Sequence, residues 1–230
     1  MKKFGTLLAM MVLVTGLASA SSVTMQLTGF SGPDGGPNTN SGVYTYPYYF
    51  TVNSGQNTYT NLALVCDSYD NEVWQYEIWQ ATEVPLNAIL SGSANGLYPN
   101  AAAYEDAAWL FAQMGTDPSD ANAAKYNWAI WGLFSSNAKL QSGYASSGAN
   151  TIIMPNAVQL SAMYQNGFFN GYVVFVPANP ANATLNGQPL PNSDTPQEYI
   201  GYFTPTPEPG SLALLGSGLF AAIMTRRRKK

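Results

Sequence analysis

The chain of 230 residues contains no histidine and only one cysteine, Cys66. The absence of histidine excludes Ser-His-Asp and Cys-His catalysis, and it excludes every metal site that uses an imidazole ligand. A single cysteine excludes a disulfide within the chain. Any chemistry must therefore rest on carboxylates, amides, hydroxyls or this one thiol, and the sequence predicts no cofactor.

Basic residues are almost absent from the middle of the chain. Of the nine lysines and arginines, only Lys125 and Lys139 lie between Ser21 and Glu208. All thirteen acidic residues lie in that stretch, so two positive charges against thirteen negative ones leave a formal charge of −11. A stretch this acidic lacks the basic surface that binds nucleic acid or an anionic membrane. We therefore expect no nucleic-acid partner.

The N-terminus has the three parts of a secretory signal peptide. Lys2 and Lys3 precede an apolar run from Phe4 to Leu17, and Ala18-Ser19-Ala20 supplies small residues for cleavage. The run is too short to span a bilayer. We expect residues 1–20 to be removed by signal peptidase after passage through the Sec translocon.

Residues 21–204 are predicted to form one extracellular domain of the α+β class. Strands are expected within 21–80 and 172–203, as an antiparallel β-sandwich or barrel, with a helical subdomain inserted at 100–166. Alternation over Val43 to Val52 predicts one strand with Tyr44, Tyr46, Tyr48, Phe50 and Val52 on the same face. The Pro- and Asn-rich stretch between Val176 and Tyr199 is expected to be a long loop.

Capping residues predict three helices in the inserted subdomain. Asn100 precedes a helix that buries Tyr104, Ala107, Ala108, Phe111 and Met114 and ends at Gly115. Asp117-Pro118-Ser119-Asp120 is typical of a cap followed by a first-turn proline, which opens a second helix running to Phe134. A third helix is expected from Asn156 to Gln165, ended by Asn166-Gly167.

Two residues of this domain are candidates for a shared site. On the second helix, Asn127 lies on the same face as Ile130, Trp131 and Phe134, at spacings of three, four and seven residues. A buried amide needs a hydrogen-bonding or covalent partner. Cys66 ends a strand whose same-face neighbours are Leu62 and Leu64. The alternative interpretation of Cys66 is a small buried side chain, which is the common role of an unpaired cysteine.

A cysteine that closes an early strand, followed by a helix containing Ala129-Ile130-Trp131, resembles the thioester domains of bacterial surface adhesins. The resemblance covers residues 44–134. In that family a glutamine amide condenses with the cysteine thiol, so the resemblance implies a thioester-like pair of Cys66 and Asn127. Asparagine is one methylene shorter than glutamine, which removes about 1.5 Å of reach.

Acidic residues offer further candidate sites. Asp67, Asp70 and Glu72 are closely spaced and can supply oxygen ligands to calcium, although a solvated acidic turn has the same composition. Glycoside hydrolysis needs a pair of carboxylates at a defined separation. Candidates for such a pair are Glu72, Glu77, Glu83, Glu105 and Asp106. The many aromatic residues are expected to pack in the core or to line a carbohydrate-binding face.

The C-terminus has the order of a sorting signal. Residues 205–210 form a Pro-rich linker with Pro207-Glu208-Pro209, residues 211–225 are apolar, and residues 226–230 are all basic. As a helix the apolar segment would extend about 22 Å, less than the roughly 30 Å hydrocarbon core. The basic residues predict a cytoplasmic C-terminus and a transient inner-membrane tether.

This order resembles the PEP-CTERM sorting signal. The resemblance implies recognition by an exosortase and cleavage near Pro207 to Pro209. It also implies delivery to the cell surface or extracellular matrix of a Gram-negative bacterium. We therefore expect an exported, non-enzymatic surface or matrix protein, adhesin-like, with extracellular polysaccharide as a partner. The alternatives are a glycan- or ice-binding module, although the threonines follow no ice-binding period, and a secreted polysaccharide hydrolase.

Overall fold

The computed structural model describes residues 21–30, 39–116, 119–178, 182–190 and 195–203. The predicted signal peptide, the linker with Pro207, Glu208 and Pro209, the apolar segment 211–225 and the basic tail lie outside these residues. Within the described ranges, none of the helices has the length and apolar character that crossing a membrane requires.

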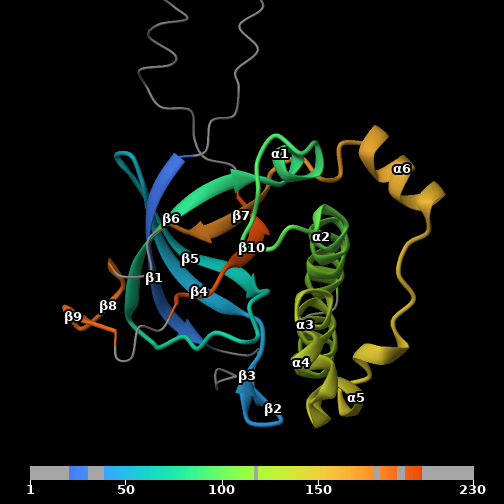
Figure 1. The fold of residues 1–230 in the computed structure, drawn as a ribbon, viewed down its shortest axis with the longest axis horizontal. Helices are drawn as coiled ribbons and strands as arrows, with labels where there is room; N and C mark the ends of the chain where they lie inside the picture. Colours follow the sequence, from blue (N-terminus) through green and yellow to red (C-terminus); the bar gives the residue numbers. More distant parts are fainter. Residues whose placement is uncertain (1–20, 31–38, 117–118, 179–181, 191–194, 204–230) are drawn as a thin grey trace, which may run out of the picture.

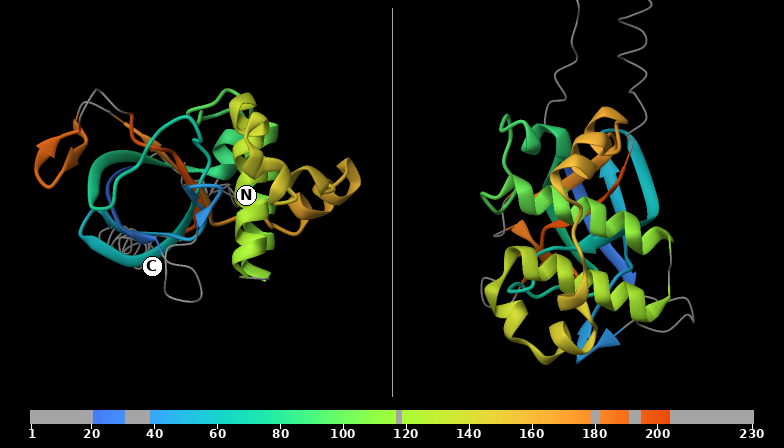
Figure 2. Two further views of the ribbon diagram at one scale, coloured as in Figure 1. Left: turned by 90° about the horizontal axis from the view of Figure 1, so that it is seen from below. Right: turned by 90° about the vertical axis from the view of Figure 1, so that its right-hand side faces the viewer.

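A closed barrel of six antiparallel strands forms the centre of the domain (Figures 1 and 2). The order around the barrel is β1 (Ser21–Phe30), β4 (Tyr48–Ser54), β5 (Asn57–Cys66), β10 (Tyr199–Tyr202), β7 (Tyr172–Pro177) and β6 (Glu77–Pro85). Pairing of β1 with β6 closes the barrel, from Ser21 opposite Glu83 to Gln26 opposite Ile78. The predicted α+β class is confirmed, and of the two predicted arrangements, sandwich or barrel, the strands form the barrel.

Side chains fill the interior of the barrel, as expected for so few strands. The burial of β1 alternates, with Val23, Met25 and Leu27 facing inward. At the centre, the Phe50 ring meets the rings of Trp79 and Tyr199 edge to face, with centroid distances of 5.8 and 4.6 Å. Edge-to-face aromatic packing adds to the stability that area burial provides.

Helices cover one side of the barrel (Figure 1). The short helix α1 (Leu86–Leu90) follows β6, and α2 (Ala101–Thr116) and α3 (Asp120–Phe134) contact β10 and β5 respectively. Asn100 caps α2 as predicted, because its Oδ1 accepts from the Ala103 N–H at 3.3 Å. The apolar face predicted for α2 is also confirmed, with Tyr104, Ala107, Ala108 and Met114 buried.

The remaining helical elements are short. α4 (Ser136–Leu140), α5 (Ser142–Ser146) and the 3-10 turn η1 (Ala149–Thr151) follow α3. Then α6 (Ala157–Gln165) begins where predicted, with Asn156 and Gln159 forming a reciprocal capping box. α6 buries none of its residues, and it projects away from the barrel in Figure 1.

Three local predictions were wrong. Residues 43–52 form two strands, β3 (Val43–Tyr44) and β4, separated at Pro47, which has no N–H to donate to a ladder. Tyr48, Phe50 and Val52 enter the barrel, but Tyr44 is 42% exposed and Tyr46 packs against Phe111 of α2. Of the other strands outside the barrel wall, β2 (Thr39–Asn40) pairs with β3, and β8 (Thr184–Leu185) pairs with β9 (Gln188–Pro189) in the predicted loop.

The second helix begins later than predicted. Its cap is Ser119, whose Oγ accepts from the Asn122 N–H at 3.4 Å, and the helix starts at Asp120. Asp117 and Pro118 lie outside the described residues. A serine and an aspartate are both good caps, so the sequence pattern allowed either start.

Candidate functional site

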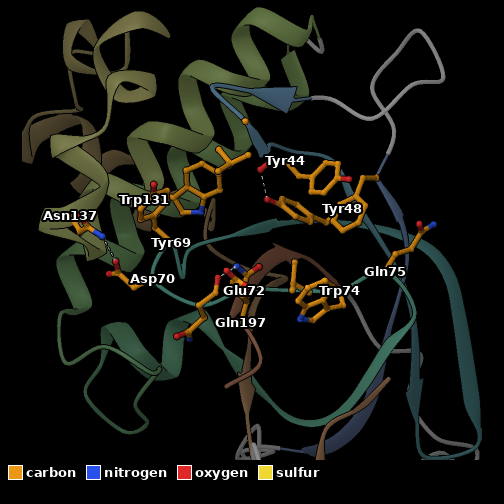
Figure 3. A pocket seen from close by; sticks show the side chains of 15 residues that line it. Tyr44, Tyr48, Tyr69, Asp70, Glu72, Trp74, Gln75, Trp131, Asn137 and Gln197 are labelled. Atoms are coloured by element: carbon orange, nitrogen blue, oxygen red, sulfur yellow. Dashed lines mark hydrogen bonds between the residues drawn. The ribbon is translucent and has the colours of Figure 1, made fainter. Parts of the chain in front are cut away.

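A pocket of about 690 Å³ opens at one end of the barrel (Figure 3). This volume lies within the range of small-molecule sites. The loop between β5 and β6, the β2–β3 hairpin, α3 and α4 all contribute to its lining. Aromatic residues of the lining are Phe30, Tyr44, Tyr48, Tyr69, Trp74 and Trp131, and polar ones are Asp70, Asn71, Glu72, Gln75, Asn137 and Gln197.

The loop between β5 and β6 forms the largest part of the pocket, since residues 69–75 all line it. Backbone hydrogen bonds fix the far end of the loop. The Tyr76 N–H donates to the Leu27 carbonyl at 2.8 Å, and the Trp74 N–H donates to Glu77 Oε2 at 3.0 Å. The loop is therefore anchored to β1 and β6 of the barrel.

Stacked and exposed rings make up the aromatic part of the lining. The rings of Phe30 and Tyr44 lie 4.2 Å apart and nearly parallel, at 8°. The Tyr48 hydroxyl donates to the Tyr44 carbonyl at 2.6 Å, which holds the hairpin against the barrel. Trp74 is 42% exposed. Figure 3 shows Tyr44, Tyr48 and Trp74 around one opening, with Tyr69 and Trp131 on another side of it.

The charged groups of the pocket are all acidic. Asp70 and Glu72 are exposed, and Asp70 accepts from the Asn137 amide at 3.0 Å. Among the described residues that line the pocket, none is a lysine or an arginine. The pocket therefore combines ring faces, amides and two carboxylates.

A buried pair of carboxyl groups, Asp67 and Glu198, lies next to the pocket-lining residues in sequence. Glu198 Oε1 accepts from the Tyr104 hydroxyl at 2.5 Å, and Oε2 accepts from the Leu97 N–H at 2.6 Å. Asp67 Oδ1 accepts from the Ser68 hydroxyl at 3.1 Å. Because Tyr104 lies on α2 and Leu97 in the segment that precedes it, these hydrogen bonds join the helical layer to the start of β10.

The two carboxyl groups share one negative charge. Burial raises the pKa of Asp67 well above its ordinary value, and the charge of Glu198 raises it further. Burial also raises the pKa of Glu198, but the neighbouring Asp67 carboxyl and the hydrogen bonds from the Tyr104 hydroxyl and the Leu97 N–H favour its charged form. Two adjacent buried carboxylates cannot both stay ionised. These effects favour the proton at Asp67 and the charge at Glu198.

Gln197 connects this buried pair to the wall of the pocket. Its amide nitrogen donates to the carbonyl oxygens of Ser68, at 3.2 Å, and Asn71, and its oxygen accepts from the Tyr199 hydroxyl at 2.8 Å. The Glu198 N–H also donates to the Ser68 hydroxyl at 3.1 Å. The start of the pocket loop is thus fastened to β10.

Cys66 and Asn127, the predicted thioester-like pair, do meet in the structure. Asn127 is fully buried, and its amide nitrogen donates to the Cys66 backbone carbonyl at 3.2 Å. Its oxygen accepts from the Tyr46 N–H at 2.7 Å. The thiol is buried, and both burial and the nearby Asp67 raise its pKa. A covalent bond between the two side chains stays a prediction.

The acidic residues considered for calcium binding or hydrolysis lie in different parts of the fold. Asp67 is buried, whereas Asp70 and Glu72 are exposed in the pocket, so the three predicted calcium ligands do not converge. In the part of the chain that the structure describes, no three acidic or cysteine residues are grouped to hold a metal ion. Of the acids considered for hydrolysis, Glu72 lines the pocket, Glu77 and Glu83 are buried, and Glu105 and Asp106 lie on α2.

Sequence reasoning missed Gln197 and Glu198. Both lie in a short stretch just before a strand, with no motif around them. Their partners earlier in the chain lie about 94 to 130 positions away. A buried glutamate is rare unless it is hydrogen-bonded, but its burial is visible only in the fold.

Comparison with known proteins identifies the C-terminal segment. A family model of the PEP-CTERM protein-sorting motif matches residues 205–229. No match was found among curated proteins or among solved structures. The matched range contains Pro207-Glu208-Pro209, the apolar segment and four of the five terminal basic residues. The chain is therefore an exported protein with a sorting signal for an exosortase, anchored transiently in the membrane and then extracellular.

Proposed function

We propose that the exported domain is a non-enzymatic, adhesin-like module of the cell surface or extracellular matrix of a Gram-negative bacterium. Its pocket at the end of the barrel binds extracellular polysaccharide. The observation that carries this proposal is the lining of the pocket, which combines the exposed rings of Tyr44 and Trp74 with the amides and carboxylates of an anchored loop. Aromatic side chains offer large, rigid contact area at low entropic cost.

Sugars match this lining chemically. A pyranose ring has apolar C–H faces, which pack on ring faces such as those of Trp74 and Tyr44, and hydroxyl edges, which pair with amides. Asn71, Gln75 and Asn137 supply such amides around the opening. Each amide both donates and accepts hydrogen bonds, as a hydroxyl does.

The sorting signal supports a binding role. Cleavage near Pro207 to Pro209 removes the apolar segment that tethers the chain. The released domain then remains at the surface only by binding something there. A polysaccharide of the extracellular matrix lies where the released domain would be, and its sugars match the lining of the pocket.

The arrangement of the pocket carboxylates favours binding over hydrolysis. Asp70 and Glu72 lie two residues apart on one loop. Glycosidases place two carboxyl groups on either side of the scissile bond. The buried Asp67 and Glu198 are tied into hydrogen bonds with Ser68, Tyr104 and Leu97. We therefore assign neither pair to catalysis.

A glycan array tests this proposal on residues 21–204, the range in which the barrel closes and its core lies. Trp74→Ala should weaken binding to the glycans found by about tenfold or more. Tyr164→Ala on α6 is the matched control, because Tyr164 is also exposed but lies outside the pocket. Absence of binding to any glycan would contradict the proposal, and release of new reducing ends from a bound glycan would overturn its non-enzymatic part.

A further inference from the structure

We infer that the pocket selects sugars with a protonated amine, such as glucosamine units without their acetyl groups, over neutral and anionic sugars. This inference rests on the proposed function and names its class of ligand. It is carried by the charges and rings that line the pocket, together with the hydrogen bonds that hold them in place.

The charge of the lining favours a cation. Asp70 and Glu72 are exposed at the opening, and no basic residue is among the described residues that line it. Lys125 lies elsewhere on α3, over the ring of Tyr126 at 5.9 Å, and Lys139 is in the last turn of α4. A uronate or a sugar phosphate would therefore meet two like charges and no counter-charge.

Two rings flank the two carboxylates on the same loop. The order Tyr69, Asp70, Asn71, Glu72, Val73, Trp74 places each carboxylate close in sequence to a ring of the lining. In Figure 3, Tyr69, Asp70, Glu72 and Trp74 surround the same opening. An ammonium group that pairs with a carboxylate there can also lie over a ring face, where the ring quadrupole attracts it. Acetylation removes both interactions because it removes the charge.

The acidic lining is held in place before a ligand arrives. Asn137 holds Asp70 through a hydrogen bond of 3.0 Å, and Gln197 fastens the loop at Ser68 and Asn71. A group that is already ordered loses less conformational entropy on binding. This distinguishes the pocket from the other acidic surface of the domain, which attracts any polycation over long range.

Isothermal titration calorimetry on residues 21–204 at 150 mM NaCl tests the inference. The probes are β-1,4-linked tetramers of glucosamine, N-acetylglucosamine and glucose, and a tetramer of galacturonate. We expect the glucosamine tetramer to bind at least tenfold more tightly than the acetylated and neutral tetramers, and the galacturonate tetramer to bind least. Spermine is a further probe, and an affinity equal to that of the glucosamine tetramer would overturn selection of a sugar.

Charge-neutral variants separate the pocket from the general acidity of the domain. The double variant Asp70→Asn, Glu72→Gln should lose the tenfold preference for the glucosamine tetramer over the neutral tetramer. The matched control is Glu105→Gln, Asp106→Asn on α2, which removes the same charge outside the pocket. An equal loss of the preference for glucosamine in this control variant would overturn the inference.

Different results would contradict polysaccharide binding and the selection of amino sugars. Equal binding of all four tetramers, or a preference for the anionic one, overturns amine selection and leaves polysaccharide binding intact. Binding of none of the tetramers, together with an empty glycan array, overturns the proposed function and the inference with it. Melting curves of both double variants confirm that each is folded.

Discussion

Tyr104 on α2 donates its hydroxyl hydrogen to the carboxylate of Glu198 across 2.5 Å, and both side chains are fully buried. The same hydroxyl accepts from the Tyr98 N–H at 3.0 Å. Burial raises the pKa of Tyr104, so the phenol keeps its proton and remains a donor. This contact joins the helical layer to the start of β10. It also supplies the buried Glu198 carboxylate with one of its hydrogen-bond donors.

Removal of the Tyr104 hydroxyl should destabilise the domain. In Tyr104→Phe, Glu198 loses a donor inside the fold, which costs about 1–3 kcal/mol of unfolding free energy. Urea denaturation of the variant measures this loss. In a Glu198→Gln background the same change should cost less, because no charge is left without its donor. Equal costs in the two backgrounds would show that the hydroxyl does not stabilise the charge.

The stability of the domain should fall as pH rises. The pKa of Asp67 is raised in the folded state, so the stability linked to its proton is complete below its ordinary pKa of about 3.9. That stability is lost as pH rises through the raised value. The pKa values of Glu198, Glu83 and Asp106 are shifted in the same direction. Thermal melts should therefore give a higher Tm at pH 5 than at pH 8.

Asp67→Asn should reduce this pH dependence. The asparagine amide can donate to Glu198 without a proton from solution, so the variant should gain stability relative to the native chain at pH 8. Asp70→Asn is the control, because Asp70 is exposed. A steeper dependence of Tm on pH in Asp67→Asn would show that Asp67 is ionised in the folded protein.

Asn127 is expected to contribute strongly to the stability of the fold. In Asn127→Ala the Tyr46 N–H and the Cys66 carbonyl both lose their partner inside the fold. Two unsatisfied backbone groups and a small cavity should cost about 3 kcal/mol, or roughly 6–12 °C in Tm. Differential scanning calorimetry checks this, with Asn137→Ala as a control at an exposed asparagine that contacts Asp70. A fall in Tm of less than 1 °C in Asn127→Ala would contradict this structural role.

Intact mass separates the two interpretations of Cys66. From the hydrogen-bonded Asn127 amide we expect the full mass, with a thiol that resists iodoacetamide in the native domain and reacts in urea. Burial and a raised pKa both suppress the reactive thiolate in the native state. A mass lower by one ammonia, with the thiol protected in urea until an amine is added, would instead establish the thioester-like pair.

Much of the fold was predictable because its signals are local. Asn100 and Asn156 cap helices, and Leu62, Leu64 and Cys66 share the buried face of a strand, as their spacing indicates. The break at Pro47 was missed because alternation of the surrounding tyrosines continues across it. An alternating pattern reports which residues can share a face, but a missing N–H decides where pairing stops.

The candidate site was predictable only in part. The sequence grouped Asp67, Asp70 and Glu72 as candidate calcium ligands. In the fold Asp67 is buried, whereas Asp70 and Glu72 are exposed at the pocket. Trp74 and Tyr44 had no pattern that separated them from core aromatics. Their exposure depends on how the pocket loop and the β2–β3 hairpin cross the end of the barrel.

The sequence by itself determined where the protein goes, because a sorting signal is contiguous and is recognised as a linear segment. It also determined the acidity of the domain and most of its helices and strands, which follow from neighbours within a few turns. Only the tertiary structure decided which carboxylates share a proton and which face a ligand. Those outcomes depend on closure of β1 on β6, on docking of α2 against β10 and on the contact of Ser68 with Glu198, which join residues about 50 to 130 positions apart.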